Sequence, residues 1–175
     1  AYDLTHYNDD CAGTFMGHEG RVRSIDVPGR LVQSDDGRDF TPRLLVSGAD
    51  DGTVRFWDIP EARCIVEVPA HADGVHVVKG DPVNKNLVYT AGKDGAVKLW
   101  DVRERRCAAT FAVPEDVLNE GVPRPIADLA TTSDGSRIFS AAGSGGARSG
   151  IIEWDKRARA FRRKVGWHEA SILSM

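Results

Sequence analysis

The sequence predicts an all-β fold built from repeated four-stranded units, and three observations lead to this prediction. Glycine makes up 18 of the 175 residues and stands between short β-branched runs rather than in one tract, as in strands joined by tight turns. Apolar residues occupy alternate positions within these runs, for example Val75 and Val77, which is the period of a strand. Finally, similar segments recur along the chain, the mark of a repeat architecture.

The repeat is clearest in the segments LLVSGADDGTVRFWDI (44–59) and LVYTAGKDGAVKLWDV (87–102). Each contains a Ser or Thr, an Asp four residues later and a Trp six residues beyond the Asp. A third segment (137–156) ends in the same Trp-Asp pair but is four residues longer in its middle. Seven-residue steps follow each Trp, giving Trp57, Cys64 and His71, then Trp100, Cys107 and Pro114, then Trp154, Phe161 and His168.

Each unit divides into four expected strands separated by turn residues. In the second unit these strands are GVHVVKG (74–80), NLVYTA (86–91), AVKLWDV (96–102) and RCAATFAV (106–113). Asp94 and Gly95 form the expected hairpin turn between the middle two. The segment EARCIVEV (61–68) is also expected to be a strand, because its Ile-Val pair favours β-structure.

These residues resemble the WD-repeat β-propeller family over practically the whole chain. The resemblance rests on Gly17-His18 with Trp57-Asp58, Ala70-His71 with Trp100-Asp101, and Trp154-Asp155 with Trp167-His168. It implies the end of one blade at 1–17, blades at 18–68 and 71–112, a divergent blade at 113–165 and the first strand of a further blade at 168–175. The divergent blade has Pro114 in place of the His and no Asp in its glycine-rich turn.

The resemblance also implies a hydrogen-bonded tetrad in each complete blade. The two expected tetrads are His18, Ser47, Asp51 and Trp57, and His71, Thr90, Asp94 and Trp100. An Asp-His-Ser set could also be a hydrolase triad, but a triad needs an exposed hydroxyl beside an oxyanion hole. Here the hydroxyl lies within an expected strand, and the set occurs twice. We therefore expect structural tetrads and no enzyme activity.

The length of the chain limits how much of a ring it forms. Three units and two partial ones amount to roughly 14 strands, or three and a half blades, whereas propellers close with about four to eight blades. We therefore expect an incomplete ring. The chain is then either an excerpt of a longer propeller or a part that another copy or another chain completes.

Composition and charge argue against several kinds of partner. The net charge is −3, and no apolar run approaches the roughly 18 residues of a membrane helix. We therefore expect no membrane contact and consider nucleic acid unlikely.

Cys11, Cys64 and Cys107 recur at equivalent positions, which predicts separate thiols rather than a metal site or disulfide. Unpaired thiols suit an intracellular compartment, cytoplasmic or nuclear, and we expect no cofactor.

Two further segments have a functional and a structural interpretation. The run Gly143–Gly150 lacks the Lys and the following helix of a phosphate loop, so we interpret it as a stretched hairpin turn. The basic stretch 156–164 falls on and before an outer strand, where charge prevents edge-to-edge aggregation. The alternatives for this stretch are contact with an acidic protein or with an RNA backbone.

The candidate partner contacts lie in loops at one end of the blades. Two long segments, 114–125 and 143–150, flank the divergent blade, and residues before the turn Asp are contact positions in the family. The candidates are Asp50, Lys93, Glu115, Asp116, Asn119, Glu120, Arg124 and Arg148.

The family resemblance implies a non-catalytic scaffold for protein–protein interactions within an intracellular complex. The alternatives are a receptor for a short or modified peptide, as in ubiquitin-ligase substrate adaptors or histone-tail readers, and an RNA-associated propeller in ribosome assembly or RNA processing.

Overall fold

The computed structural model describes residues 14–28, 43–112, 124–143 and 149–168, and all statements below concern these ranges. Within them the chain forms 12 strands in three antiparallel sheets of four strands each. None of these residues belongs to a helix long and apolar enough to cross a membrane. The prediction of an all-β fold built from four-stranded units is confirmed.

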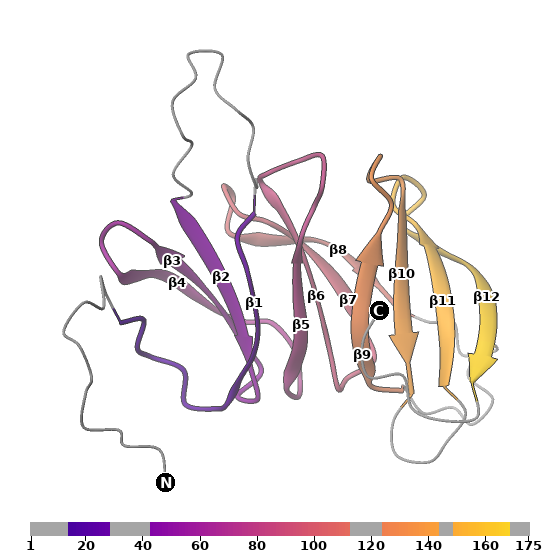
Figure 1. Ribbon diagram of the computed structural model, residues 1–175, viewed down its shortest axis with the longest axis horizontal. Coiled ribbons are helices and arrows are strands. Elements are labelled where there is room, and N and C mark those ends of the chain that lie inside the picture. Colours follow the sequence, from indigo (N-terminus) through magenta and orange to yellow (C-terminus); the bar gives the residue numbers. More distant parts are fainter. Residues whose placement is uncertain (1–13, 29–42, 113–123, 144–148, 169–175) are drawn as a thin grey trace, which may run out of the picture.

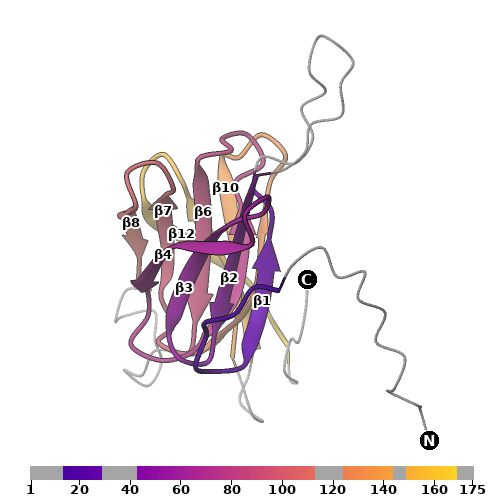
Figure 2. The same ribbon diagram turned by 90° about the vertical axis from the view of Figure 1, so that its left-hand side faces the viewer.

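Each sheet follows the order of its strands in the chain. The first sheet comprises β1 (Val22–Asp26), β2 (Leu44–Ala49), β3 (Thr53–Asp58) and β4 (Arg63–Pro69). The second comprises β5 (Val75–Gly80), β6 (Leu87–Gly92), β7 (Val97–Asp101) and β8 (Arg106–Phe111). The third comprises β9 (Ile126–Thr131), β10 (Arg137–Ala142), β11 (Ser149–Asp155) and β12 (Ala160–His168). The sheets stand in a row (Figure 1), and the view along the row shows them stacked face to face (Figure 2).

Two apolar layers hold the row together. Between the first and second sheets, Phe56 and Val54 pack with Val88 and Trp100. Between the second and third sheets, the layer includes Leu99, Tyr89, Phe111, Ile138 and Trp154. Trp100 therefore faces the first sheet and Trp154 the second, whereas Phe56 and Leu99, each directly before a tryptophan, face the sheet that follows. This alternation follows from the two-residue period of a strand.

The same local irregularities recur in all three sheets. The pairing register shifts just before Trp57, Trp100 and Trp154. Five residues after each of these tryptophans, a residue other than glycine adopts a positive φ, at Ala62 (47°), Arg105 (54°) and Arg159 (52°). The divergent third unit therefore keeps the strand geometry of the other two.

The turns between the second and third strands differ in one respect from the sequence prediction. Gly52 and Gly95 adopt φ values of 78° and 74° in the first two sheets, a conformation that glycine tolerates without steric cost. In the third sheet, Ser149 and Gly150 belong to β11 rather than to the turn, and Gly150 pairs with Ala142. The run 143–150 thus connects an antiparallel pair, as expected of a hairpin, but its last two residues belong to β11, and residues 144–148 lie outside the described ranges. β12 is correspondingly long and continues to His168, which pairs with Ser149.

Candidate functional site

A chain of side-chain hydrogen bonds crosses the first sheet at its tryptophan. The indole Nε1–H of Trp57 donates to Ser47 Oγ at 2.8 Å, and Ser47 Oγ lies 2.7 Å from His18 Nε2. Because the Asp51 carboxylate can only accept, His18 Nδ1 carries a proton and donates it in a hydrogen bond to Asp51 Oδ2 at 3.1 Å. In the neutral imidazole, Nε2 then accepts the Ser47 hydroxyl, whose oxygen accepts from the indole. Hydrogen-bond direction thus fixes the tautomer of His18.

The second sheet repeats this arrangement. Trp100 Nε1–H donates to Thr90 Oγ1 at 2.8 Å, and Thr90 Oγ1 lies 2.8 Å from His71 Nε2. His71 Nδ1 lies 2.9 Å from both carboxylate oxygens of Asp94. The structure therefore brings together all four residues of each predicted tetrad.

The hydroxyls in these chains are not placed for catalysis. Ser47 and Thr90 are 3% and 0% exposed, so an external substrate has no access to either oxygen. Each oxygen also accepts a hydrogen bond from an indole N–H, which occupies one of the two electron pairs that a nucleophile could use. The arrangement satisfies buried polar groups and fixes the loops that carry His18 and His71.

The surroundings of the tetrads change the pKa of two members. Burial alone would raise the pKa of Asp51, but hydrogen bonds from Thr53, Gly20 and His18 outweigh it and hold the pKa well below its usual range. For His71, burial lowers the pKa, and the hydrogen bond to Asp94 only partly opposes this effect. The neutral form of His71 is therefore favoured, in agreement with its role as acceptor at Nε2.

The third sheet has one of the hydrogen bonds found in the tetrads. Trp154 Nε1–H donates to Ser140 Oγ at 2.9 Å, and Ser140 is fully buried. The sequence prediction stressed the missing His and Asp of this unit, yet the hydroxyl–indole hydrogen bond is present. This hydrogen bond was not predicted, because the interval from Ser140 to Trp154 is four residues longer than the corresponding interval in the other units.

A buried carboxylate joins the second and third sheets. The side chain of Asp81 is 0% exposed and accepts hydrogen bonds from Tyr89 Oη–H at 2.7 Å and from the amides of Val83 and Asn84. Lys156, from the turn between β11 and β12, forms an ion pair with it across the two sheets. Burial opposes the charge of Asp81, but Lys156 and the hydrogen bonds lower its pKa below the ordinary value.

The predicted partner-contact residues fall into two groups. Asp50 is bound to Arg23 at 2.7 Å, and its side chain is 27% exposed, so it already has an intramolecular partner. Lys93 is 45% exposed and lies 3.4 Å from Asp73, which makes it the more accessible of the two. Arg124 lies two residues before the start of β9. The remaining candidates, Glu115, Asp116, Asn119, Glu120 and Arg148, lie outside the described residues.

The basic stretch is not simply a solvated edge. Arg163 Nε donates to Glu153 Oε2 at 2.6 Å, and Arg137 Nη1 donates to Glu153 Oε1 at 2.9 Å. Arg162 Nε lies 3.6 Å from Glu153 Oε1. The Glu153 side chain is 0% exposed beneath these arginines, and the hydrogen bond from Arg163 lowers its pKa, with further contributions from Arg137 and Arg162.

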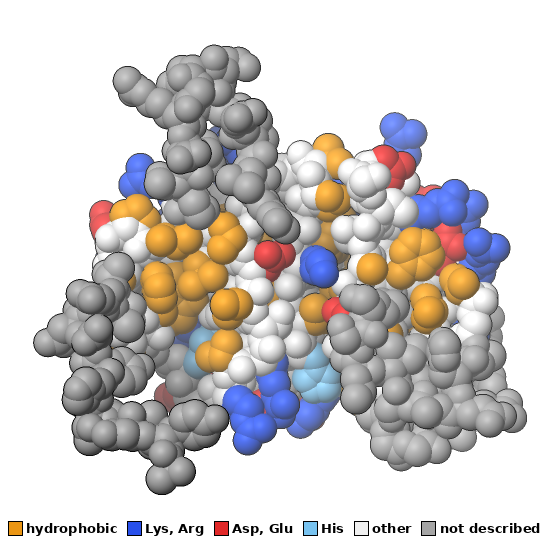
Figure 3. Space-filling model, in the orientation of Figure 1, with side chains coloured by type: hydrophobic (Ala, Val, Ile, Leu, Met, Phe, Trp, Pro, Cys, Tyr) orange, Lys and Arg blue, Asp and Glu red, His pale blue; other side chains and the backbone are white. Residues whose placement is uncertain are grey.

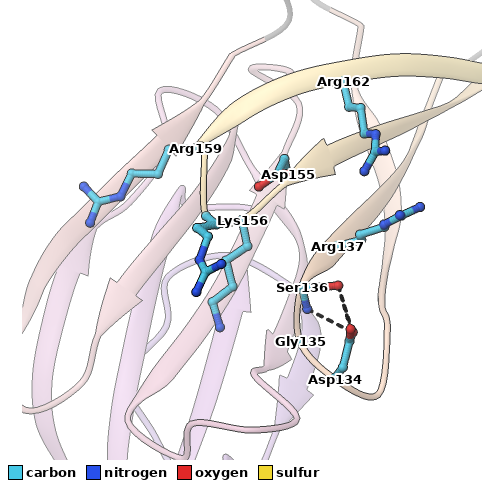
Figure 4. A pocket seen from close by; sticks show the side chains of 9 residues that line it. Asp134, Gly135, Ser136, Arg137, Asp155, Lys156, Arg159 and Arg162 are labelled. Atoms are coloured by element: carbon cyan, nitrogen blue, oxygen red, sulfur yellow. Dashed lines mark hydrogen bonds between the residues drawn. The ribbon is translucent and has the colours of Figure 1, made fainter.

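Beside this cluster lies a hollow of about 730 Å³ between two turns of the third sheet. The residues that line it are Asp134, Gly135, Ser136, Arg137, Asp155, Lys156, Arg157, Arg159 and Arg162. In Figure 4, Arg137 and Arg162 lie on one side of the hollow, whereas Lys156 and Arg159 point to the other. Charged side chains also gather over this end of the third sheet in the space-filling view (Figure 3).

Sequence reasoning missed several polar residues with defined roles. The Thr53 hydroxyl donates to Asp51 Oδ1 at 2.7 Å and lies 3.0 Å from His18 Nδ1, which extends the first tetrad. Asp81 and Glu153 were not singled out either. The alignment of the units contained a signal for Glu153, because it precedes Trp154 where Phe56 and Leu99 precede their tryptophans. Nothing in the sequence pairs Asp81 with Lys156, 75 residues away.

Comparison with known families agrees with this geometry. The family model described as "WD domain, G-beta repeat" matches residues 9–58 and 62–101, just over half of the chain. Repeated four-stranded sheets with a Ser or Thr bound to the Trp of each unit are what this family predicts. The chain belongs to the WD-repeat family, and its three sheets are blades of an incomplete propeller ring.

Curated relatives match a similar share of the chain. The ribosome biogenesis protein ERB1 of Coccidioides immitis is 36% identical over 90 residues, which cover 51% of this chain and 9% of the relative. The protein of that name from Aspergillus niger is 36% identical over 90 residues, covering 51% and 10%. The Yarrowia lipolytica protein is 31% identical over 86 residues, covering 46% and 9%. The matched part thus spans about a tenth of these relatives.

Proposed function

We propose that this chain is a non-catalytic scaffold that mediates protein–protein interactions within an intracellular complex, one that takes part in ribosome biogenesis. The observation that supports a scaffold is that the polar side chains of the tetrads form their hydrogen bonds with one another. The Ser or Thr, the His and the Asp of both tetrads are bonded to one another, so they hold the blades rigid instead of acting on a substrate. The similarity to ribosome biogenesis proteins suggests the kind of complex.

Rigid blades present their loops as fixed contact surfaces. At the end that carries the turns β2–β3 and β6–β7, the backbone of each turn is tied to the preceding loop, Asp50 N to Arg21 O at 2.9 Å and Lys93 N to Gly74 O at 3.0 Å. The Lys93 side chain projects from this fixed backbone and is 45% exposed. We propose Lys93 as a contact residue, with Asp50 and Arg124 as further candidates at this end and Glu115, Asp116, Asn119, Glu120 and Arg148 as candidates outside the described residues.

The test is association with a large particle in the cells that make the protein. Epitope-tagged protein is separated by sucrose-gradient sedimentation, and the proteins that co-purify with it are identified by mass spectrometry. We expect co-sedimentation with pre-ribosomal particles. Sedimentation solely as free protein, under conditions that preserve those particles, would contradict the proposal.

A pair of lysine variants tests the contact surface. We expect Lys93→Ala to reduce recovery of the co-purifying proteins several-fold. The control is Lys85→Ala, which removes the same charge from an exposed position in the turn between β5 and β6, at the opposite end of the second sheet. Equal recovery with both variants would remove Lys93 from the contact surface.

A further inference from the structure

The outward face of the third sheet differs in chemistry from the corresponding faces of the other two. In the first sheet, Leu44, Phe56 and Val66 occupy three equivalent positions and pack toward the second sheet. In the second sheet, the positions hold Leu87, Leu99 and Ala109, which pack toward the third. The third sheet has Arg137, Glu153 and Arg163 at these positions. Three charged side chains thus stand where the other two sheets have three apolar ones.

The cations of this cluster exceed its anions. Glu153 has two carboxylate oxygens, and Arg137 and Arg163 already donate to them. Arg162 stands 3.6 Å away, outside hydrogen-bonding distance, and its side chain is 44% exposed. Each guanidinium carries five N–H donors, so most donors of Arg162 are available to an external acceptor.

The acidic residues of the adjoining hollow offset only part of this excess, because Asp134 and Asp155 are outnumbered by the cations Arg137, Lys156, Arg157, Arg159 and Arg162. Asp134 accepts from the amide and the hydroxyl of Ser136 (Figure 4), and its pKa is lowered to about 2 by the hydrogen bonds of its own turn. Asp155 accepts from the amide of Ala158 at 2.8 Å. Both carboxylates are thus engaged by local turn hydrogen bonds. The Arg157 side chain forms no hydrogen bond or ion pair with any described residue.

Two cations of the hollow have other roles. Lys156 binds Asp81 across the sheets, and Arg159 Nη1 lies 3.3 Å from the carbonyl oxygen of Ala108. They hold the turn between β11 and β12 against the second sheet. Arg157 and Arg162 are therefore the cations of the hollow whose side chains have no hydrogen-bonded partner among the described residues, and they extend from an anchored turn and strand.

We propose that this hollow and the adjoining arginine face form a docking site for an acidic segment of a partner protein, with Arg157 and Arg162 binding its carboxylates. The structure itself contains the corresponding interaction, because arginines of this face already bind the Glu153 carboxylate. Planar guanidinium and carboxylate groups pair through two parallel hydrogen bonds. The site lies at the opposite end of the sheets from Lys93, so it does not depend on the function proposed above.

A nucleic acid fits this site less well. Single-stranded nucleic acid is typically bound by aromatic side chains that stack on the bases beside a basic groove. Phe161, the one aromatic residue of the stretch 156–164, contacts Trp154 with ring centroids 6.1 Å apart and planes at 85°. Its ring belongs to the protein interior, so this stretch presents no aromatic side chain on which a base could stack.

The test is fluorescence anisotropy with a fluorescein-labelled octaglutamate peptide and the purified protein. We compare the parent with the double variant Arg157→Glu and Arg162→Gln. The control, Arg103→Glu and Arg105→Gln, changes the net charge equally in the matching turn of the second sheet. We expect at least tenfold weaker binding for the first pair and less than a twofold change for the control. Thermal melts identify any loss of folding.

The outcomes separate the site from general charge attraction. Equal weakening by both double variants would overturn the proposal, because only net charge would then matter. Absence of octaglutamate binding to the parent protein would also overturn it. A labelled oligouridylate of the same length is the second probe, and tighter binding of this probe, sensitive to Arg157 and Arg162, would replace an acidic protein segment with a nucleic acid.

Discussion

Ser140 of β10 accepts the indole proton of Trp154 of β11 at 2.9 Å, in a blade that has neither the His nor the Asp of the other two. The oxygen and the indole are both buried. The hydroxyl–indole hydrogen bond is therefore the part of the tetrad common to all three blades. His and Asp extend it toward the loop before the first strand in the first and second blades.

Removing the tetrad hydroxyl should lower the free energy of unfolding more in a blade where this hydroxyl also binds a histidine. Ser47→Ala leaves both Trp57 Nε1–H and His18 Nε2 without their partner, whereas Ser140→Ala affects only Trp154. An unsatisfied buried polar group costs roughly 1–3 kcal/mol. We expect losses of about 3 kcal/mol for Ser47→Ala and about 1.5 kcal/mol for Ser140→Ala, measured by urea denaturation. Equal losses would mean that His18 contributes nothing through this hydrogen bond.

The lowered pKa of His71 predicts a loss of stability in mild acid. In the unfolded chain His71 binds a proton as the pH falls through about 6.5, whereas the buried folded form resists protonation. The unfolded state therefore binds more protons, and the stability present above this pH is lost as the pH falls below it. Asp94 opposes the shift, and Lys98 and His76 add to it.

We expect the thermal midpoint to fall by several degrees between about pH 7.5 and about pH 5.5. The variant His71→Gln should be less stable at pH 7.5 and show a smaller decrease, because it carries no titrating group at this position. Proton NMR of His71 gives its pKa directly. A measured pKa at or above 6.5 would contradict the prediction.

Much of the fold and of both tetrads could be predicted from the sequence. The fixed spacing of Ser47, Asp51 and Trp57 within one hairpin makes their proximity a local consequence of strand pairing. A short-range repeat carries this information without knowledge of how the blades stack. For the same reason, the expected strand in the segment 61–68 was found as β4.

The polar contacts between blades could not be predicted in this way. Asp81 and Lys156 belong to different blades, and their pairing depends on how two sheets stack and on the path of a turn. Glu153 appears from the sequence as one more charged strand residue. Its burial becomes evident when three arginines from two neighbouring strands are placed over it in space.

The ion pair between Lys156 and Asp81 should stabilise the contact between the second and third blades. Lys156→Met leaves a carboxylate buried without its cation, which typically costs about 3–5 kcal/mol of the free energy of unfolding. The double variant Asp81→Asn with Lys156→Met should be more stable than the sum of the single losses implies, because the interaction is then removed only once. Urea denaturation of the four proteins measures this coupling.

The control for this cycle is Lys93→Met, which removes an exposed lysine 3.4 Å from Asp73. Exposed ion pairs contribute little to stability, so the urea midpoint should not change. Additive losses in the cycle of Asp81 and Lys156 would show that the two side chains do not interact in solution.

The charged outward face of the third blade should also limit self-association. The triple variant Arg137→Leu, Glu153→Leu and Arg163→Ala gives this blade the residues that the second blade carries at Leu87, Leu99 and Ala109. Exposed apolar area favours association by roughly 25 cal/mol per Å² that becomes buried. We expect the variant to sediment as larger species than the parent at equal concentration. The control Arg137→Lys, Glu153→Asp and Arg163→Lys keeps the charges and should have the sedimentation coefficient of the parent. An unchanged sedimentation coefficient for the apolar variant would show that the charges do not limit association.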